Sequence, residues 1–366
     1  MPVIARILCV SVFVVLAVGC AHTPPASGIS ASLASLPPCT TTVTDRQLAM
    51  LQTITEMEPS HEHDVTARRL GLQAFPFNYD VCEFNIFDKR PAYTVYMTHD
   101  ESLFVVSFKG SQANYADIIA DLNNKAEEDD PEWGELYLPP GPAGFRGKLK
   151  TTGAEEQIKA FLAEHRSASC RASVVVTGHS LGGSLAMLVA PQLDGVRWQP
   201  SAPSGTLQPD IGPHQVERVV TFGAPPYVKK GADSEAGNLV EGGIQPAVLQ
   251  HYAPKVSNYI ASGDFIPMTY NIAGNGSGDV AERALARTGV APAVFRHVGS
   301  LDQVGVVDPH VPPCGHSMLT YIVDMGFGPP SLDPHTPGVF NDRCDYHRPD
   351  WQQWMSLATW QNAATP

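Results

Sequence analysis

The chain has 366 residues, of which 43% are hydrophobic and 17% charged, an ordinary globular composition with enough apolar material for one core. Its formal charge of -13 and its isoelectric point near 5.4 argue against nucleic acid as a partner. Many of the carboxylates gather in one run from Glu127 to Glu135, which we interpret as a solvated surface loop.

The first twenty residues are typical of a targeting segment. Arg6 supplies a positive charge, and the apolar stretch from Ile7 to Val18 is too short to span a membrane comfortably. It runs into a segment ending at Cys20 that resembles a bacterial lipobox, in which the cysteine is lipidated and becomes the mature N-terminus; Ala17 departs from the usual Leu. We expect a cell-envelope lipoprotein, on the outer membrane or the periplasmic side, held at the membrane surface by a lipid on Cys20. A plain secretory signal and a secreted protein are the alternative.

The composition divides the rest of the chain into a tether, one domain and a tail. Residues 21–40 are rich in Ser, Ala and Pro, which predicts a flexible tether after a signal peptide at 1–20. The length would allow two domains, but α/β sheets of this size are often single. We therefore expect one domain over residues 41–350 and a C-terminal tail over 351–366.

The cysteines do not form a metal-binding pattern. Apart from those in the targeting segment they are Cys39, Cys82, Cys170, Cys314 and Cys344. They include no Cys-x-x-Cys pair and no zinc-like Cys/His spacing, so we expect no metal site. An exported chain can form disulfides, but five cysteines leave one free, and the sequence does not determine the pairing.

Helix and strand patterns alternate along the domain. Thr44 and Gln47 have the spacing of a capping box at a helix start, and Thr152 and Glu155 predict a second helix start in the same way. Two β-rich runs separated by a short polar turn predict a hairpin, and two further strands follow later. These strands are expected at residues 92–97, 103–108, 216–222 and 256–260. The alternation predicts an α/β fold with a mostly parallel central sheet and helices on both faces.

The most informative segment centres on Ser180. A β-branched run at Val174–Val176 leads into Gly-His-Ser-Leu-Gly, and an apolar helical run follows at 184–190. This pattern predicts a nucleophile elbow, in which Gly178 and Gly182 stand where side chains would collide, so that the serine can stand exposed in strained geometry. The helix N-terminus beneath the serine offers free N–H groups to a developing oxyanion. Ser180 is therefore our candidate nucleophile.

A serine nucleophile needs an imidazole base and an acid that orients the imidazole. His179 cannot be the base merely by adjacency, because the elbow turns its side chain away from that of Ser180. In elbow enzymes the acid follows a later strand. Asp264 comes directly after the run at 256–260, whereas Asp279 has no strand before it, so Asp264 is the preferred acid.

The base must come from the histidines after the acid. These are His297, His310, His316, His335 and His347. His297 lies beside the start of a predicted strand, whereas His316 opens a loop that turns into a helix, which suits a mobile imidazole. We prefer His316 on these grounds.

Several blocks in this order resemble a known family. The blocks are Phe104–Ser111, Ile118–Leu122, Gly144–Phe145, Gly178–Ala186, Thr221–Pro225 and Asp264–Pro267. Together they resemble the class 3 lipases of fungal-lipase type, within the α/β hydrolases, and the resemblance spans residues 92–322. That family carries a His-Val-Gly segment before its catalytic His-x-x-x-x-Tyr, so the resemblance assigns His297 to a structural place and His316 to the base.

The resemblance implies a single-domain α/β-hydrolase fold and a carboxylic ester hydrolase that needs no cofactor. It implies a Ser180, Asp264 and His316 triad, with an oxyanion hole from the backbone N–H of Leu181 and from the N–H and hydroxyl of Ser111. The implied partner is a lipid or ester substrate. Triacylglycerol lipases, phospholipases A1 and short-chain or feruloyl esterases share this machinery, so the sequence does not separate them. The alternative from another class is a non-catalytic envelope lipoprotein that retains the fold.

Some features depart from the family pattern or stay open. Lys109 stands where the family has Arg, and Pro226–Tyr227 replaces Arg-Val or Arg-Ile. Within residues 112–122, Tyr115, Ile118, Ile119 and Leu122 form one apolar stripe of a helix. This helix is either a mobile lid over the site or a static helix packed on the core.

Overall fold

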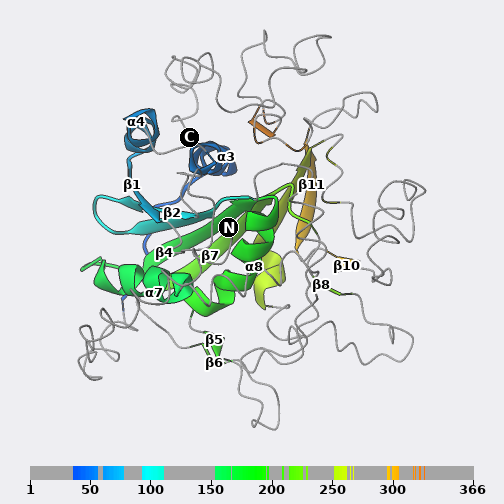
Figure 1. Cartoon of the computed structure of the whole chain (residues 1–366). Helices are drawn as coiled ribbons and strands as arrows, with labels where there is room; N and C mark the ends of the chain where they lie inside the picture. The colour runs from blue at the N-terminus through cyan, green and yellow to red at the C-terminus, as the bar shows by residue number, and fades with distance from the viewer. Residues whose placement is uncertain are drawn as a thin grey trace, which may run out of the picture.

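The structure is a computed structural model (Figure 1). It describes residues 36–56, 61–77, 93–110, 153–165, 167–194, 196–197, 208–209, 214–225, 228–229, 251–261, 264, 267, 295–296, 299–304, 316, 318, 321–322 and 325. Outside the described residues lie the predicted signal peptide, most of the tether, Ser111, the segment 112–122, His297 and the predicted C-terminal tail.

The core of the protein is a seven-stranded sheet in the order β1-β2-β3-β4-β7-β9-β11. Its strands are β1 (Leu72–Phe77), β2 (Tyr93–Thr98), β3 (Leu103–Phe108), β4 (Ala172–His179), β7 (His214–Phe222), β9 (Val256–Ala261) and β11 (Ser300–Val304). Every pairing from β3 to β11 is parallel, whereas β1 pairs with β2 and β2 with β3 in antiparallel register. The predicted hairpin and the mostly parallel sheet are therefore confirmed.

Helices cover both faces of this sheet (Figure 1). The helices are α3 (Asp45–Thr55), α4 (His61–Arg69), α7 (Ala154–Glu164), α8 (Leu181–Leu193) and the short 3-10 helix η1 (Ala253–Lys255). Helices α3 and α4 lie on one face, and α7 and α8 on the other. Two small two-stranded sheets are formed by β5 (Val196–Arg197) with β6 (Gln208–Pro209), and by β8 (Val228–Lys229) with β10 (Phe295–Arg296).

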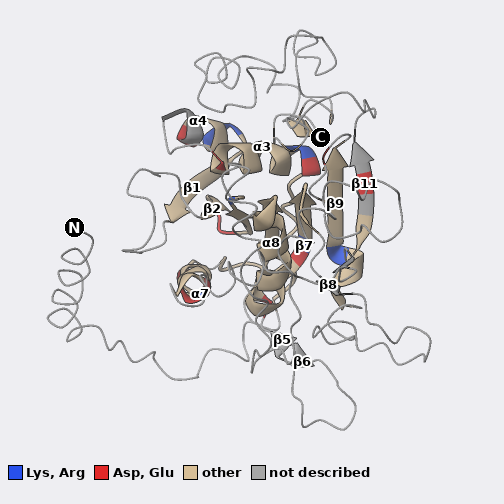
Figure 2. Ribbon diagram, turned by 45° about the vertical axis from the view of Figure 1, so that its right-hand side comes forward, with Lys and Arg blue, Asp and Glu red and all other residues tan. Residues whose placement is uncertain are grey.

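Alternate residues of the central strands enter two separate cores. In β3, Phe104 and Val106 pack with α7 and α8, whereas Val105 packs with α3. In β4, Val174 and Val175 divide between the same two cores. Because both faces are covered, β3 and β4 are buried along their whole length and carry no Asp, Glu, Lys or Arg. Strand β7 does carry charged residues (Figure 2).

The ends of two helices test the capping predictions. Thr44 and Gln47 form the predicted capping box before α3, with the Gln47 N–H donating to the Thr44 hydroxyl. The prediction that Thr152 caps α7 is wrong. The N-cap of α7 is Gly153, in a left-handed conformation with φ 68° and without a side-chain cap, because the chain turns one residue later than the pattern indicated.

Taken together, the mostly parallel sheet, its two helical layers and the direct passage from β4 into α8 make this a single-domain α/β-hydrolase fold. Of the described helices, none is both long and apolar enough to cross a membrane.

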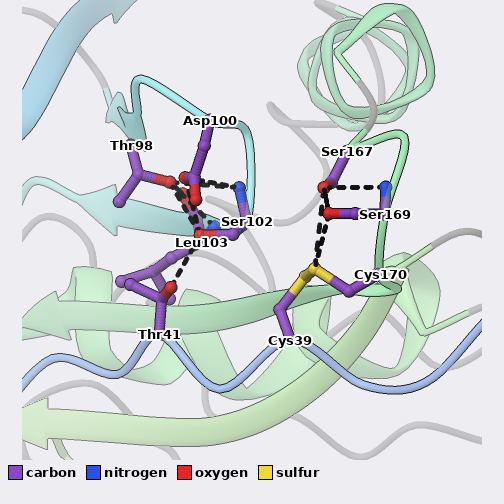
Figure 3. The surroundings of a disulfide bond; sticks show 9 residues. All are labelled: Cys39, Thr41, Thr98, Asp100, Ser102, Leu103, Ser167, Ser169 and Cys170. Atoms are coloured by element: carbon purple, nitrogen blue, oxygen red, sulfur yellow. Dashed lines mark hydrogen bonds between the residues drawn. A yellow bond between two sulfur atoms is a disulfide. The ribbon is translucent and has the colours of Figure 1, made fainter.

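A disulfide joins the start of the described chain to the sheet (Figure 3). Cys39 is bonded to Cys170, which lies just before β4, and the neighbouring Pro38 forms a parallel β-bridge with Arg171. The sequence left this pairing open. The bond closes a long loop, since its cysteines are 131 residues apart in sequence.

Removal of this disulfide should destabilise the protein without altering its contacts elsewhere. The Cys39→Ser/Cys170→Ser double variant is expected to lose about 2 to 5 kcal/mol of unfolding free energy, because the unfolded chain regains the entropy of a long open loop. Urea unfolding measures the loss as a lower midpoint. Ser169→Ala, at an exposed position beside the bond, is the control and should unfold like the wild type. Equal midpoints for the double variant and the wild type would contradict the expectation.

Candidate active site

The candidate nucleophile lies at the sharp turn between β4 and α8. Ser180 has φ 55° and ψ -131°, and a positive φ is strained for a residue with a side chain. A Cβ on Gly178 would overlap the carbonyl of Gly182, and a Cβ on Gly182 would overlap the carbonyl of Phe108 at the end of β3. The turn can therefore form only with glycine at both places, as the sequence pattern predicted.

The structure brings Ser180, His316 and Asp264 together. Nε2 of His316 lies 2.7 Å from Oγ of Ser180, and Nδ1 of His316 lies 2.9 Å from both carboxylate oxygens of Asp264. All three side chains are buried. Since a carboxylate only accepts, Nδ1 donates to Asp264, which leaves the lone pair of Nε2 facing the serine hydroxyl. This is the hydrogen-bond order that activates a serine.

Tyr321 and Gly223 complete the surroundings of Asp264. The Tyr321 hydroxyl donates to Oδ2 of Asp264 over 2.5 Å. Gly223 has φ 59°, and a Cβ there would lie 2.5 Å from the same oxygen, so the backbone passes too close for a side chain. The sequence contained Tyr321 only as the last residue of the His-x-x-x-x-Tyr pattern, and its contact with the acid was not predicted.

His179 contacts the backbone of the candidate base. Its Nε2 lies 2.7 Å from the carbonyl oxygen of His316, and the two imidazole rings are 4.7 Å apart between centroids. A carbonyl only accepts, so Nε2 of His179 is the donor. Its other nitrogen, Nδ1, lies 3.5 Å from a carboxylate oxygen of Glu56. No pattern in the sequence indicated a role for His179 or Glu56.

The candidate oxyanion donors are the N–H of Leu181 and Ser111, the residue after Gly110. Leu181 is the first residue of α8, so its N–H belongs to the helix N-terminus directly after Ser180. Ser111 is outside the described residues, but its neighbour Gly110 lies against the serine turn. A Cβ on Gly110 would be 3.0 Å from Cβ of Ser180.

A buried polar network ties α3 to the end of β3 behind this site. The Gln52 side chain donates to the Phe108 carbonyl and accepts from the Ser107 hydroxyl, and Thr55 bonds to both Ser107 and Tyr96. Burial raises the pKa of Tyr96, so its hydroxyl stays neutral and donates to a helix carbonyl. The network fixes the carboxyl end of β3, from which the chain continues to Gly110.

No three His, Cys, Asp or Glu side chains gather as a metal-binding group within the part of the chain that the structure describes. Asp279, the weaker acid candidate, and Cys20, the candidate lipidation site, lie outside the described residues, as does His297.

The contact of Gly182 in α8 with the end of β3 predicts that a substitution that normally stabilises a helix will destabilise this protein. Gly→Ala in a helix normally stabilises it by about 1 kcal/mol. Gly182→Ala should instead lower the melting temperature and abolish most of the activity, because the added Cβ would overlap the Phe108 and Lys109 carbonyls. Thermal unfolding followed by circular dichroism measures the effect. A melting temperature equal to or above that of the wild type would show that the turn is not packed as described.

Comparison with known proteins finds a match to one family model. A model of the family "Lipase (class 3)" matches residues 105–273, a segment that includes Ser180 and Asp264. A search of curated proteins found no match.

Among solved structures, the chain is similar to the Lip2 lipase of Yarrowia lipolytica, with 15% identity over 74% of this chain and 80% of that one, and a TM-score of 0.40. It is also similar to a deletion mutant of Rhizomucor miehei lipase in its propeptide complex, with 14% identity over 78% and 82% of the two chains and a TM-score of 0.42. The family match supports the resemblance to class 3 lipases seen in the sequence, and the chain is a lipase-type serine ester hydrolase, that is, a carboxylic ester hydrolase.

Proposed function

We propose that the protein cleaves lipid acyl esters, of triacylglycerol or phospholipase A1 type, through an acyl-enzyme on Ser180. The observation that carries the proposal is the hydrogen-bonded series from Asp264 through His316 to Ser180, which lies at a strained turn bordered by glycines. The family match supplies the ester chemistry.

In the proposed first step, Oγ of Ser180 attacks the ester carbonyl carbon while Nε2 of His316 takes its proton. The Asp264 carboxylate holds the imidazole in the reactive tautomer and stabilises its positive charge. Tyr321 donates to Oδ2 of that carboxylate and holds it in place. Collapse of the tetrahedral intermediate releases the alcohol, which takes the proton from His316. A water molecule, deprotonated by the same nitrogen, then attacks the acyl-enzyme. The bond to Oγ of Ser180 breaks, this oxygen takes the proton back from His316, and the acid is freed.

The tetrahedral oxyanion is proposed to bind two donors. One is the N–H of Leu181 at the positive end of the α8 dipole, and the other is Ser111, through its N–H and hydroxyl. The position of Gly110 against Ser180 supports the second donor, since Ser111 is the next residue. Loss of one such donor commonly removes about 3 kcal/mol of transition-state stabilisation.

The substrate proposal has one alternative within the same chemistry, a short-chain or feruloyl-type esterase. Hydrolysis of p-nitrophenyl esters of increasing chain length separates the two, and assays on triglyceride and phospholipid emulsions then distinguish the lipid classes. The match to a lipase family disfavours the other alternative, a non-catalytic envelope protein.

We also propose that the protein acts in the cell envelope as a lipoprotein held by Cys20. The lipobox-like segment supports this, and so does the Cys39–Cys170 disulfide, because structural disulfides persist in oxidising compartments outside the cytoplasm. The alternative is a secreted protein with the same disulfide.

The catalytic assignment is tested by removal of single groups. Ser180→Ala and His316→Ala should each lower kcat on p-nitrophenyl butyrate by about 10⁴-fold or more, because triad members act as a unit. Ser184→Ala is the matched control, since it removes another buried hydroxyl of α8, bonded to the Pro225 carbonyl, and should retain activity. His297→Ala should mainly lower stability. A Ser180→Ala protein with more than about a tenth of wild-type activity would overturn the assignment.

The anchor is tested by Cys20→Ser. Wild-type protein should incorporate labelled palmitate and sediment with membranes, because several acyl chains on one residue suffice for stable anchoring. Cys20→Ser should do neither. Release of both forms into the soluble fraction in equal amounts would refute lipidation and favour the secreted protein.

A further inference from the structure

Glu56 is a buried acid that the proposed chemistry does not use. It is the C-cap residue of α3, and its side chain is 7% exposed. A negative charge at this end of a helix is unfavourable, because the helix dipole places partial negative charge there. Burial adds the cost of removing the charge from water. An acid at this place therefore needs hydrogen-bond donors that offset both costs.

The donors to Glu56 come from its own helix and from Gly110, in the segment Gly110–Ser111 that we call the oxyanion segment. Its Oε1 accepts from the N–H of Gly110 over 2.8 Å and from the Gln52 side chain over 2.9 Å. Gly110 directly precedes Ser111 and lies against Ser180. The hydrogen bond from the Gly110 N–H therefore ties the residue before Ser111 to the end of α3.

The same oxygen faces the histidine that contacts the base. Nδ1 of His179 lies 3.5 Å from Oε1 of Glu56, and Nε2 of His179 donates to the carbonyl oxygen of His316. His179 and Glu56 are both buried. A shift of the His179 ring would move the main chain of His316 and so the nitrogen that faces Ser180.

We infer that Glu56 and His179 form a positioning pair, which holds the oxyanion segment through Gly110 and the base through the carbonyl of His316. The inference rests on the proposed serine mechanism. Neither residue of the pair takes a proton from the substrate or forms a bond to it. Their contribution is to keep two parts of the site, from distant segments of the chain, at the spacing that the transition state requires.

Substitutions that keep or remove the relevant hydrogen bond test the pair. Glu56→Gln retains an acceptor for the Gly110 N–H, and His179→Gln retains a donor near the place of Nε2, whereas Glu56→Leu and His179→Leu retain neither. The Leu variants are expected to lose about 10-fold to 100-fold in kcat on p-nitrophenyl butyrate with little change in KM, and the Gln variants to recover most of it. The rate at which a fluorophosphonate labels Ser180 should fall in parallel.

The control is Thr53→Ala, on the same helix. Thr53 is buried, and among the described residues its hydroxyl bonds only to the Ala49 carbonyl within α3, so its loss should lower the melting temperature and leave kcat and labelling unchanged. If folded Glu56→Leu and His179→Leu label and turn over like the wild type, the pair has no positioning role. A kcat loss in Thr53→Ala as large as in these variants would likewise assign the effect to stability.

The design also separates this inference from the mechanism on which it rests. Should Glu56→Leu not fold, the comparison of His179→Leu with His179→Gln decides, because His179→Leu leaves the bond between Glu56 and Gly110 in place. An active Ser180→Ala protein would overturn the serine mechanism itself. An inactive, unlabelled Ser180→Ala protein together with fully active Leu variants would overturn only the positioning pair.

Discussion

The close approach of the α8 backbone to the end of β3 is the constraint on which the site depends. Gly182 lies so near the Phe108 and Lys109 carbonyls that no Cβ fits between them. This contact sets the distance between the helix N-terminus, which carries the Leu181 N–H, and the strand end, which leads to Ser111. Glycine in a helix and strain at Ser180 each cost about 1 kcal/mol or more, so the turn persists only because its surroundings hold it.

The two cores provide that support. Helix α8 is buried along nearly its whole length against β3, β4 and β7, and the opposite face of the same strands is covered by α3. Because β4 is packed on both sides, its carboxyl end is fixed in position, and Ser180 follows it directly. Rigid elements of this kind hold catalytic groups more accurately than loops do. Asp264 likewise comes three residues after the end of β9, a neighbour of β7 in the sheet.

Much of this could be predicted from local patterns, and the rest depends on contacts between distant segments. The elbow, the hairpin and the box at Thr44 all have signals within a few residues. The choice of His316 over His297 needed the family resemblance in addition. The predicted N-cap of α7 was wrong by one residue. The Cys39–Cys170 pairing and the bond from Glu56 to Gly110 join residues 131 and 54 positions apart, with no local pattern to indicate them.

The site contains two neighbouring histidines with their rings tilted by 32°, each beside its own buried carboxylate, yet only one of them can serve as a base. His316 has Nδ1 bonded to Asp264 and Nε2 facing Ser180. His179 has Nε2 committed to a main-chain carbonyl, so it has no nitrogen available to the serine. Its remaining nitrogen faces Glu56 at 3.5 Å, a longer separation than the 2.9 Å between His316 and Asp264. This difference between the two histidines comes from the backbone. The turn at Ser180 directs the side chain of His179 toward the main chain of His316 and not toward the serine hydroxyl. A histidine at that place can therefore support the base but cannot replace it.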